Sequence, residues 1–201
     1  GLSLAFVGTS ATIADTINVP GDHPTIAAAI AASHDGDVIK IAPGIYNEHS
    51  LYPGGKAITI QGTLNGDESL ATTIDAQQNG RVFEITSGET SATVIQFLIM
   101  TGGQLGTGGG ISIRNNSNPT IRNCTISGNV AHYGGGIYCE GSNPTISGCK
   151  ISGNVGTYGG GIMCYGNSNP IISGCTISDN TASEGGGIYC ESSSNPTISS
   201  C

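Results

Sequence analysis

Short runs that alternate apolar and small polar residues dominate the second half of the chain. Typical runs are NPTIS, CTIS and GIYC, and Gly, Asn and Ser separate them. Alternation with a period of two predicts β-strands, and the separating clusters predict turns. The runs leave no room for a helix of about ten residues. We therefore expect strands and turns throughout this part of the chain.

The same runs recur with a fixed period. A GGG triplet precedes isoleucine at intervals of 26, 25 and 26 residues, and Asn-Pro recurs at intervals of 25, 26 and 26. Because independent markers share one period, the chain contains an internal repeat of about 25 residues. The marker positions are Ile111, Ile137, Ile162 and Ile188, and Asn118, Asn143, Asn169 and Asn195.

A unit of this length, with three short strands, cannot bury its apolar side alone, so successive copies must stack. This predicts an all-β fold, a parallel β-helix (solenoid) of six or seven coils. Equivalent residues should then form inward columns about 4.8 Å apart. The predicted columns are Ile121, Ile146 and Ile172; Ile126, Ile151 and Ile177; and Ile137, Ile162 and Ile188.

Residues 20–201 are predicted to form one domain, with regular repeats over 94–201. Residues 20–93 should hold irregular first coils, built from strand-like runs at 38–42, 57–61 and 82–85. The segment 23–32 is the one helical stretch, with Ile26 and Ile30 on one face. We expect this helix to cap the apolar end of the stack.

Residues 1–19 admit two interpretations. An apolar stretch followed by small residues, ending at Ala14, suggests the remnant of a secretion signal and an extracellular or cell-surface location. The alternative is a first strand of the fold, or a strand donated to a neighbouring molecule. No run approaches the roughly 20 apolar residues of a membrane span.

Charge narrows the range of partners. Only 10% of the residues are charged, and 6 Lys plus Arg stand against 14 Asp plus Glu, for a net charge of −8. A chain without a basic surface is a poor partner for nucleic acid or an anionic membrane.

Several segments resemble the right-handed parallel β-helix proteins of the pectin-lyase-like group. They are HPTIAAAIAASHDGDVIKIAPGIYNE (23–48), KAITIQG (56–62) and the repeated SNPTISGC, TISGN and GGGIYC. The GGGI and SGN elements are also similar to repeats of bacterial surface adhesins and autotransporter-like proteins. The resemblance implies a right-handed β-helix, but the group includes lyases, hydrolases, esterases, adhesins and fibres, so it implies no single function.

Candidate catalytic residues do not cluster in the repeats. The acidic residues after Gly102 are Glu140, Asp179, Glu184 and Glu191, and no two of them form an adjacent pair. The four histidines lack the spacing of metal ligands. We therefore predict no catalytic site, no metal and no cofactor in these residues.

The seven cysteines fall into two series with the period of the repeat. One series aligns with Leu98 and the other with Ile113 of the preceding coil, so we expect small hydrophobic side chains that face the core. Disulfides between neighbouring coils are the alternative. The series are Cys124, Cys149, Cys175 and Cys201, and Cys139, Cys164 and Cys190.

Asparagine and tyrosine also recur at fixed positions. Asn129, Asn154 and Asn180 follow Ser-Gly or Ser-Asp, where asparagine tolerates left-handed backbone and its amide can bond the next coil. Tyrosines recur beside GGG at outward positions, which predicts either a ladder that stiffens this face or a surface that binds sugar rings. The candidate binding residues are Tyr133, Tyr138, Tyr158, Tyr165 and Tyr189.

Three functions follow from these observations. The first is a secreted or surface-displayed scaffold, adhesin or fibre without catalysis, which assembles end to end with copies of itself. The second is a polysaccharide-active enzyme whose site lies outside these residues. The third is a glycan-binding module that uses the tyrosine face to bind extracellular polysaccharide.

Overall fold

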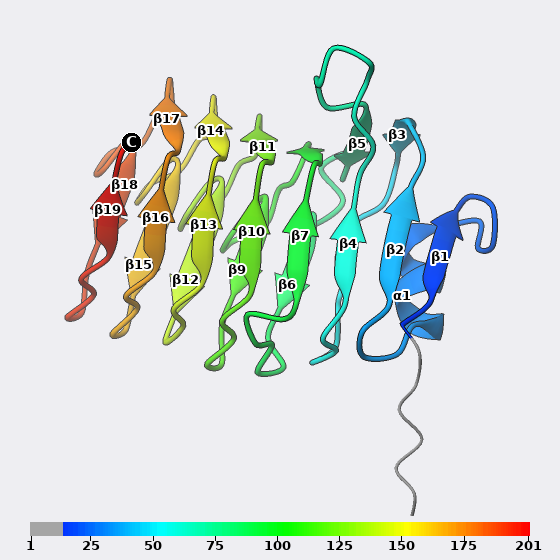
Figure 1. The fold of residues 1–201 in the computed structure, drawn as a ribbon. Coiled ribbons are helices and arrows are strands. Elements are labelled where there is room, and N and C mark those ends of the chain that lie inside the picture. The colour runs from blue at the N-terminus through cyan, green and yellow to red at the C-terminus, as the bar shows by residue number, and fades with distance from the viewer. Residues whose placement is uncertain (1–13) are drawn as a thin grey trace, which may run out of the picture.

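Three parallel sheets wind into a β-solenoid of about seven turns in the computed structural model, which describes residues 14–201 (Figure 1). Sheet A consists of β1 (Thr16–Val19), β2 (Val38–Ile41), β4 (Thr59–Gln61), β7 (Val94–Gln96), β10 (Thr120–Arg122), β13 (Thr145–Ser147), β16 (Ile171–Ser173) and β19 (Thr197–Ser199). Sheet B consists of β3 (Gly44–Tyr46), β5 (Thr72–Asp75), β8 (Ile99–Thr101), β11 (Thr125–Ser127), β14 (Lys150–Ser152) and β17 (Thr176–Ser178). Sheet C consists of β6 (Phe83–Ile85), β9 (Ile111–Ile113), β12 (Ile137–Glu140), β15 (Ile162–Tyr165) and β18 (Ile188–Cys190).

The register of the strands follows the period of the sequence. Ile121 is aligned with Ile146, and Ile146 with Ile172, in sheet A. Sheets B and C align the other two isoleucine columns in the same way. Alternate side chains point to opposite faces of a strand, so these isoleucines fill the interior. The predicted β-helix and its inward columns are confirmed.

Helix α1 (Ile26–Ala32) covers the N-terminal end of this interior with Ile26, Ala29 and Ile30. Thr25 begins the helix, because its hydroxyl accepts a hydrogen bond from the amide of Ala28 at 3.1 Å. The predicted N-terminal helix is confirmed, although it begins three residues after His23.

Side chains from later segments hold both ends of α1. The Glu48 carboxylate accepts hydrogen bonds from the free amides of Ile26 and Ala27 at 2.8 and 2.9 Å. Lys56 Nζ donates to the carbonyls of Ile30 and Ala31 at the other end. A negative group at the start of a helix and a positive group at its end both interact favourably with the helix dipole. The cap is therefore fastened to the first coils.

A protruding hairpin interrupts the first coils. Residues 63–71 rise above the body of the solenoid between β4 and β5 (Figure 1). Leu64 and Leu70 form an antiparallel bridge in this hairpin, and Asn65 bonds Ser69 across it. The repeat does not predict the hairpin, because none of the regular coils over 94–201 has one.

A residue with left-handed backbone turns the chain immediately before Asn129, Asn154 and Asn180. Gly128, Gly153 and Asp179 have φ of 67°, 65° and 57°. The expectation that the asparagines themselves adopt this conformation is wrong, because the preceding residue makes the turn. The freedom of glycine at positive φ explains why glycine fills two of these positions.

Part of the segment 1–19 belongs to the solenoid. Strand β1 pairs in parallel with β2, and the Asp15 amide bonds the Asp37 carboxylate at 2.8 Å. Residues 12 and 13 of the candidate cleavage site lie outside the described residues, so export stays a prediction. Within residues 14–201 no helix is long and apolar enough to span a membrane.

Candidate functional site on the outer face of sheet C

Two rows of side chains cover the outer face of sheet C. The register aligns Glu84, Ser112, Tyr138, Met163 and Tyr189 in one row, each on its own strand. A second row follows two residues later along the strands. In it Glu140 is aligned with Tyr165 of the next coil, and Arg114 follows β9 in the preceding coil. The face therefore changes from charged to aromatic along the axis.

Four tyrosines meet on the aromatic part of this face. The ring of Tyr133 stacks on Tyr158, with centroids 5.5 Å apart and an angle of 14° between the rings. Tyr138 lies 6.4 Å from Tyr133, and Tyr189 lies 5.5 Å from Tyr158. His132 packs edge-on against Tyr133 at 4.3 Å. Such contacts stabilise neighbouring coils against each other.

The glycine triplets bring these rings onto the sheet. Gly159 has φ of 64°, and a Cβ there would lie 2.9 Å from Cβ of Met163. Only glycine lets the loop lie this close to the strand that follows it. The loop then places its own tyrosine over the outward side chains of sheet C.

The expectation that Tyr138 is exposed for binding is wrong, and Met163 in the same row is also buried. Strand alternation turns them outward, but the loop covers them, so Tyr138 is 6% exposed and Met163 is 1% exposed. Burial, with the Glu140 carboxylate nearby, raises the pKa of Tyr138. The stacked faces of Tyr133 and Tyr158 are turned to each other. This arrangement favours the ladder interpretation over a platform for sugar rings.

A polar groove of about 710 Å³ lies on the charged part of the same face. Glu84, Arg114 and Glu140 line it, together with Asn115. Arg114 Nη2 lies 3.5 Å from Glu84 Oε1, and the buried Arg81 lies 3.6 Å from the same oxygen. Two guanidinium groups therefore face one carboxylate, while Glu140 lies on the other side of Arg114.

Several buried polar atoms beneath this face have no hydrogen-bond partner. They are Nε and Nη1 of Arg81, Nε of Arg114 and Oγ of Ser112, all shielded from solvent. Desolvation lowers the pKa of Arg81. Because these atoms are not open to the groove, the candidate site consists of the polar side chains that line it, Glu84, Arg114, Asn115 and Glu140.

Sequence reasoning missed this groove. Its candidate residues did not include Arg81, Glu84 or Arg114. The signal that identifies Glu84 is its register with Ser112 and Tyr138, which becomes visible once β6 is aligned with the regular repeats.

The asparagine positions form two hydrogen-bonded columns. Asn129 donates its side-chain amide to Asn154 Oδ1, and Asn154 donates to Asn180 Oδ1, both at 3.0 Å. In the second column, the backbone amide of Asn143 donates to Asn118 Oδ1 at 2.7 Å, and the column continues through Asn169 to Asn195. These amides are bound within the protein and offer little to a ligand.

All seven cysteines are free thiols, and five of them are buried. Desolvation raises the pKa of Cys139 to about 12. A hydrogen bond with Cys124 is the main cause that raises the pKa of Cys149 to about 12. Thiols that hold their protons so firmly are poor nucleophiles and poor metal ligands. Within residues 14–201, no group of three or more His, Cys, Asp or Glu residues could hold a metal ion.

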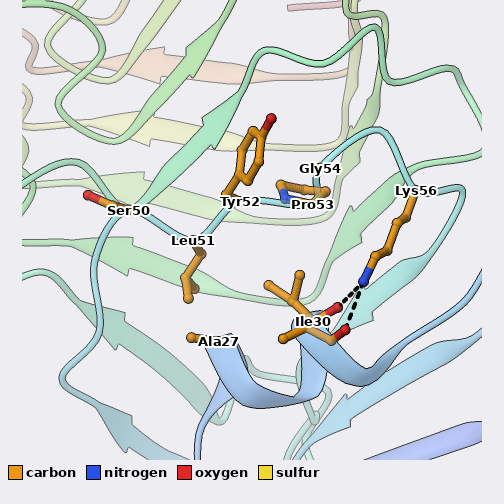
Figure 2. Close-up of a pocket in the computed structure, with 9 residues that line it drawn as sticks. Ala27, Ile30, Ser50, Leu51, Tyr52, Pro53, Gly54 and Lys56 are labelled. Carbon is orange, nitrogen blue, oxygen red and sulfur yellow. Dashed lines mark hydrogen bonds between the residues drawn. The ribbon is translucent and has the colours of Figure 1, made fainter.

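A second cavity, of about 370 Å³, lies between α1 and the segment 50–56 (Figure 2). Ala27 and Ile30 line it from the helix, and Leu51 faces them. Lys56 closes one side, but its ammonium group is already bound to the carbonyls at the end of α1. The remaining lining is largely apolar, so this cavity provides no group for chemistry.

The fold and the comparisons identify the class of protein. A family model described as "Right handed beta helix region" matches residues 71–201. The chain belongs to this family of right-handed β-helix repeat proteins. Comparison with curated proteins and with solved structures found no match.

Proposed function

We propose that this chain is a non-catalytic, secreted or surface-displayed scaffold of adhesive type that binds extracellular polysaccharide on the outer face of sheet C. The observation that carries the proposal is the polar groove, which Glu84, Arg114, Asn115 and Glu140 line together. Carboxylates, guanidinium groups and amides are the groups that bond sugar hydroxyls. The resemblance to surface adhesins agrees with this function.

The proposal moves the binding site from the tyrosines to the groove. Tyr138 is buried, and the faces of Tyr133 and Tyr158 cover each other. Tyr165 keeps a place in the proposal, because it is aligned with Glu140 at the edge of the groove and is partly exposed.

Retention on a panel of immobilised polysaccharides tests this function. Arg114→Ala should lose retention, since it removes the cation that lines the groove. Lys150→Ala removes an exposed basic residue from sheet B and should bind like the parent protein. Equal retention of both variants would rule out the groove as the binding site.

A second candidate is hydrolysis of a polysaccharide. Glu84 and Glu140 line one groove from strands two coils apart, about 10 Å along the axis. Inverting glycosidases hold two carboxyl groups at about 6.5–9.5 Å. Arg81 and Arg114, however, both contact the Glu84 carboxylate and compete with a substrate for it. New reducing ends that Glu140→Gln abolishes would favour this candidate over simple binding.

End-to-end assembly remains a further proposal. The strands pair in parallel from coil to coil along the axis, and a coil of another copy offers the same backbone groups for pairing. At the N-terminal end α1 covers the interior, so a second copy would have to displace the helix to continue the stack there. Electron microscopy of the purified protein checks this idea, and monomers at high concentration would exclude it.

A further inference from the structure

We propose that Asn123 is a site of N-linked glycosylation, where the side-chain amide takes a sugar from a glycosyl diphosphate. The segment Asn123-Cys124-Thr125 has the acceptor pattern Asn-x-Ser/Thr, in which proline is excluded from the middle position. The pattern occurs once more in the chain, at Asn115-Asn116-Ser117. The Asn-Pro-Thr segments at Asn118, Asn143 and Asn195 do not qualify, because proline follows the asparagine. The proposal concerns a modification of the chain and does not depend on the groove of sheet C.

The side chain of Asn123 is open to solvent. Asn123 lies in the turn between β10 and β11, has φ of 52° and is exposed. Within residues 14–201 its side-chain amide has no hydrogen-bond partner, whereas its backbone amide donates to the carbonyl of Ser147 at 3.0 Å. The backbone therefore holds the turn in place, and the amide that would take the sugar stays free.

The rest of the Asn123 pattern also faces outward where it must. Cys124 is 2% exposed and points into the core. Thr125 lies on the outer face of β11, half-buried, and is aligned with Ile99 and Lys150 of the neighbouring coils. Because side chains alternate along a strand, the turn and the strand present the Asn123 amide and the Thr125 hydroxyl on the outside together. A transferase can therefore read both from the folded chain.

The fold closes the second pattern. Asn115 Nδ2 donates to the carbonyl of Thr86 at 3.0 Å. Ser117 is fully buried, and its hydroxyl donates to the Glu89 carboxylate at 2.8 Å and accepts from the amide of Gly88 at 3.1 Å. A transferase would have to break these bonds and expose Ser117, so Asn115 should not be modified in the folded chain.

A linked sugar has room beside Asn123. Asn123 and Thr125 line a surface depression of about 490 Å³, together with Leu64 and Leu70 of the hairpin and Phe97. Phe97 occupies the equivalent turn of the preceding coil and is half-buried. An aromatic ring at this place can pack against the apolar face of the first sugar.

The reaction is a transfer to nitrogen. Asn123 Nδ2 forms a bond to the anomeric carbon of the sugar, and the bond between that carbon and the diphosphate oxygen breaks. The diphosphate leaves with the electron pair, and Nδ2 loses one proton to a base of the transferase. The donor is a nucleoside diphosphate sugar or a polyprenyl diphosphate oligosaccharide, because both carry the same activated bond.

Mass mapping after treatment of the folded full chain tests the proposal. One arm uses a soluble asparagine-directed transferase with a nucleoside diphosphate hexose, and the other a detergent-solubilised transferase with a polyprenyl diphosphate oligosaccharide. Trypsin then separates the two patterns, because it cleaves after Arg114 and Arg122. We expect at least tenfold more sugar on Asn123 than on Asn115, and the arm that modifies Asn123 identifies the donor.

A fragment of the same chain provides the control for folding. Cleavage after glutamate releases residues 90–140, which contain both patterns outside the solenoid. We expect this fragment to be modified at both asparagines. A fragment that is modified at Asn123 while the folded chain is not, in either arm, would overturn the proposal. A fragment without sugar on Asn123 in both arms would overturn it too, as would equal modification of Asn115 and Asn123 in the folded chain.

Substitutions at the third position separate this pattern from unspecific transfer. Thr125→Ala should abolish modification of Asn123, although the asparagine is still present, and Thr125→Ser should retain it. Thr176→Ala removes a threonine in the same row of sheet B, two coils further on, and should be modified like the parent chain. Thermal unfolding checks that the variants are folded. Undiminished transfer to Thr125→Ala would overturn the proposal.

Discussion

Asn129 and Asn154 occupy equivalent positions in neighbouring coils, and both are fully buried. Asn154 Oδ1 accepts two hydrogen bonds from Asn129, one from the backbone amide at 3.1 Å and one from the side chain at 3.0 Å. The Asn154 side chain donates in turn to the carbonyl of Ile126 at 2.9 Å. One amide thus satisfies three groups that have no access to water.

Asn154→Ala should therefore destabilise the solenoid strongly. It removes the acceptor of the buried Asn129 backbone amide and the side-chain donor to the Ile126 carbonyl, while Asn129 Nδ2 keeps Met100 and Ser127 as acceptors. The expected loss is about 2–4 kcal/mol. Denaturant unfolding measures it. Asn180→Ala in the partly exposed last coil is the control and should cost less. Equal losses would show that burial does not set the strength of the ladder.

Two glycines with the same backbone conformation should respond differently to a methyl group. Gly134 and Gly153 have φ of 62° and 65°. A Cβ at Gly134 would lie 2.3 Å from the Ile137 carbonyl oxygen, whereas a Cβ at Gly153 has nothing within 4 Å. Gly153→Ala should cost about 1–2 kcal/mol for the left-handed backbone alone. Gly134→Ala should cost about 1–3 kcal/mol more, because atoms must also move. Thermal unfolding compares the two, and similar costs would contradict the close packing of the loop.

Alkaline pH should destabilise the fold through the buried thiols. The pKa of Cys139 is about 12 in the folded chain, and an exposed thiol has a pKa of about 8.5. Below a pH of about 8.5 the thiol is protonated in both states, so its full contribution to stability is present. Between the two values the unfolded chain binds fewer protons, so the free energy of unfolding falls by about 1.4 kcal/mol per pH unit for such a thiol. Unfolding at pH 8 and pH 10 measures this slope, and Cys139→Val should reduce it. An identical slope in the variant would show that other groups cause the loss.

The exposed cysteines should react with a thiol reagent faster than the buried ones. Cys190 and Cys201 are exposed, and the other five are buried. We expect two thiols to react quickly with a disulfide reagent in the native protein and all seven to react after denaturation. Fewer than seven in the denatured, unreduced protein would indicate disulfides between coils.

Removal of the Glu48 carboxylate should loosen the N-terminal cap. Glu48→Ala leaves the amides of Ile26 and Ala27 without their acceptor, and the expected loss is about 1–2 kcal/mol. Hydrogen exchange of the α1 amides measures the local effect. Glu191→Ala removes an exposed carboxylate from the last coil and should leave this exchange unchanged.

The regular coils could be predicted because each position occurs several times in the sequence. Ile121, Ile146 and Ile172 reveal by their spacing that they share one column, and a parallel sheet is the structure that stacks them. The repeated Asn-Pro and GGG segments have the same spacing and support the same alignment. Repetition therefore predicts the fold well beyond what a single strand pattern allows.

The candidate site could not be predicted in the same way, because its residues have no copies. Glu84 and Arg81 lie in an irregular coil, and their contact with Arg114 depends on side-chain directions. Glu89 shows the same limit. It is fully buried and accepts hydrogen bonds from Ser117 Oγ and two backbone amides, yet nothing in the repeat indicates an interior carboxylate. Strand alternation predicts correctly that Tyr138 points outward, but it does not predict that Tyr138 is buried. The loop that covers Tyr138 reaches it only in the folded chain.

The hydrogen bonds of all three sheets run along the axis of the solenoid, from each coil to the next. A force that pulls the two ends apart therefore loads these bonds directly, and the coils open one after another. Each opened coil of about 25 residues releases about 85 Å of chain. A solenoid built in this way lengthens in steps under tension, and the opening of each coil dissipates work.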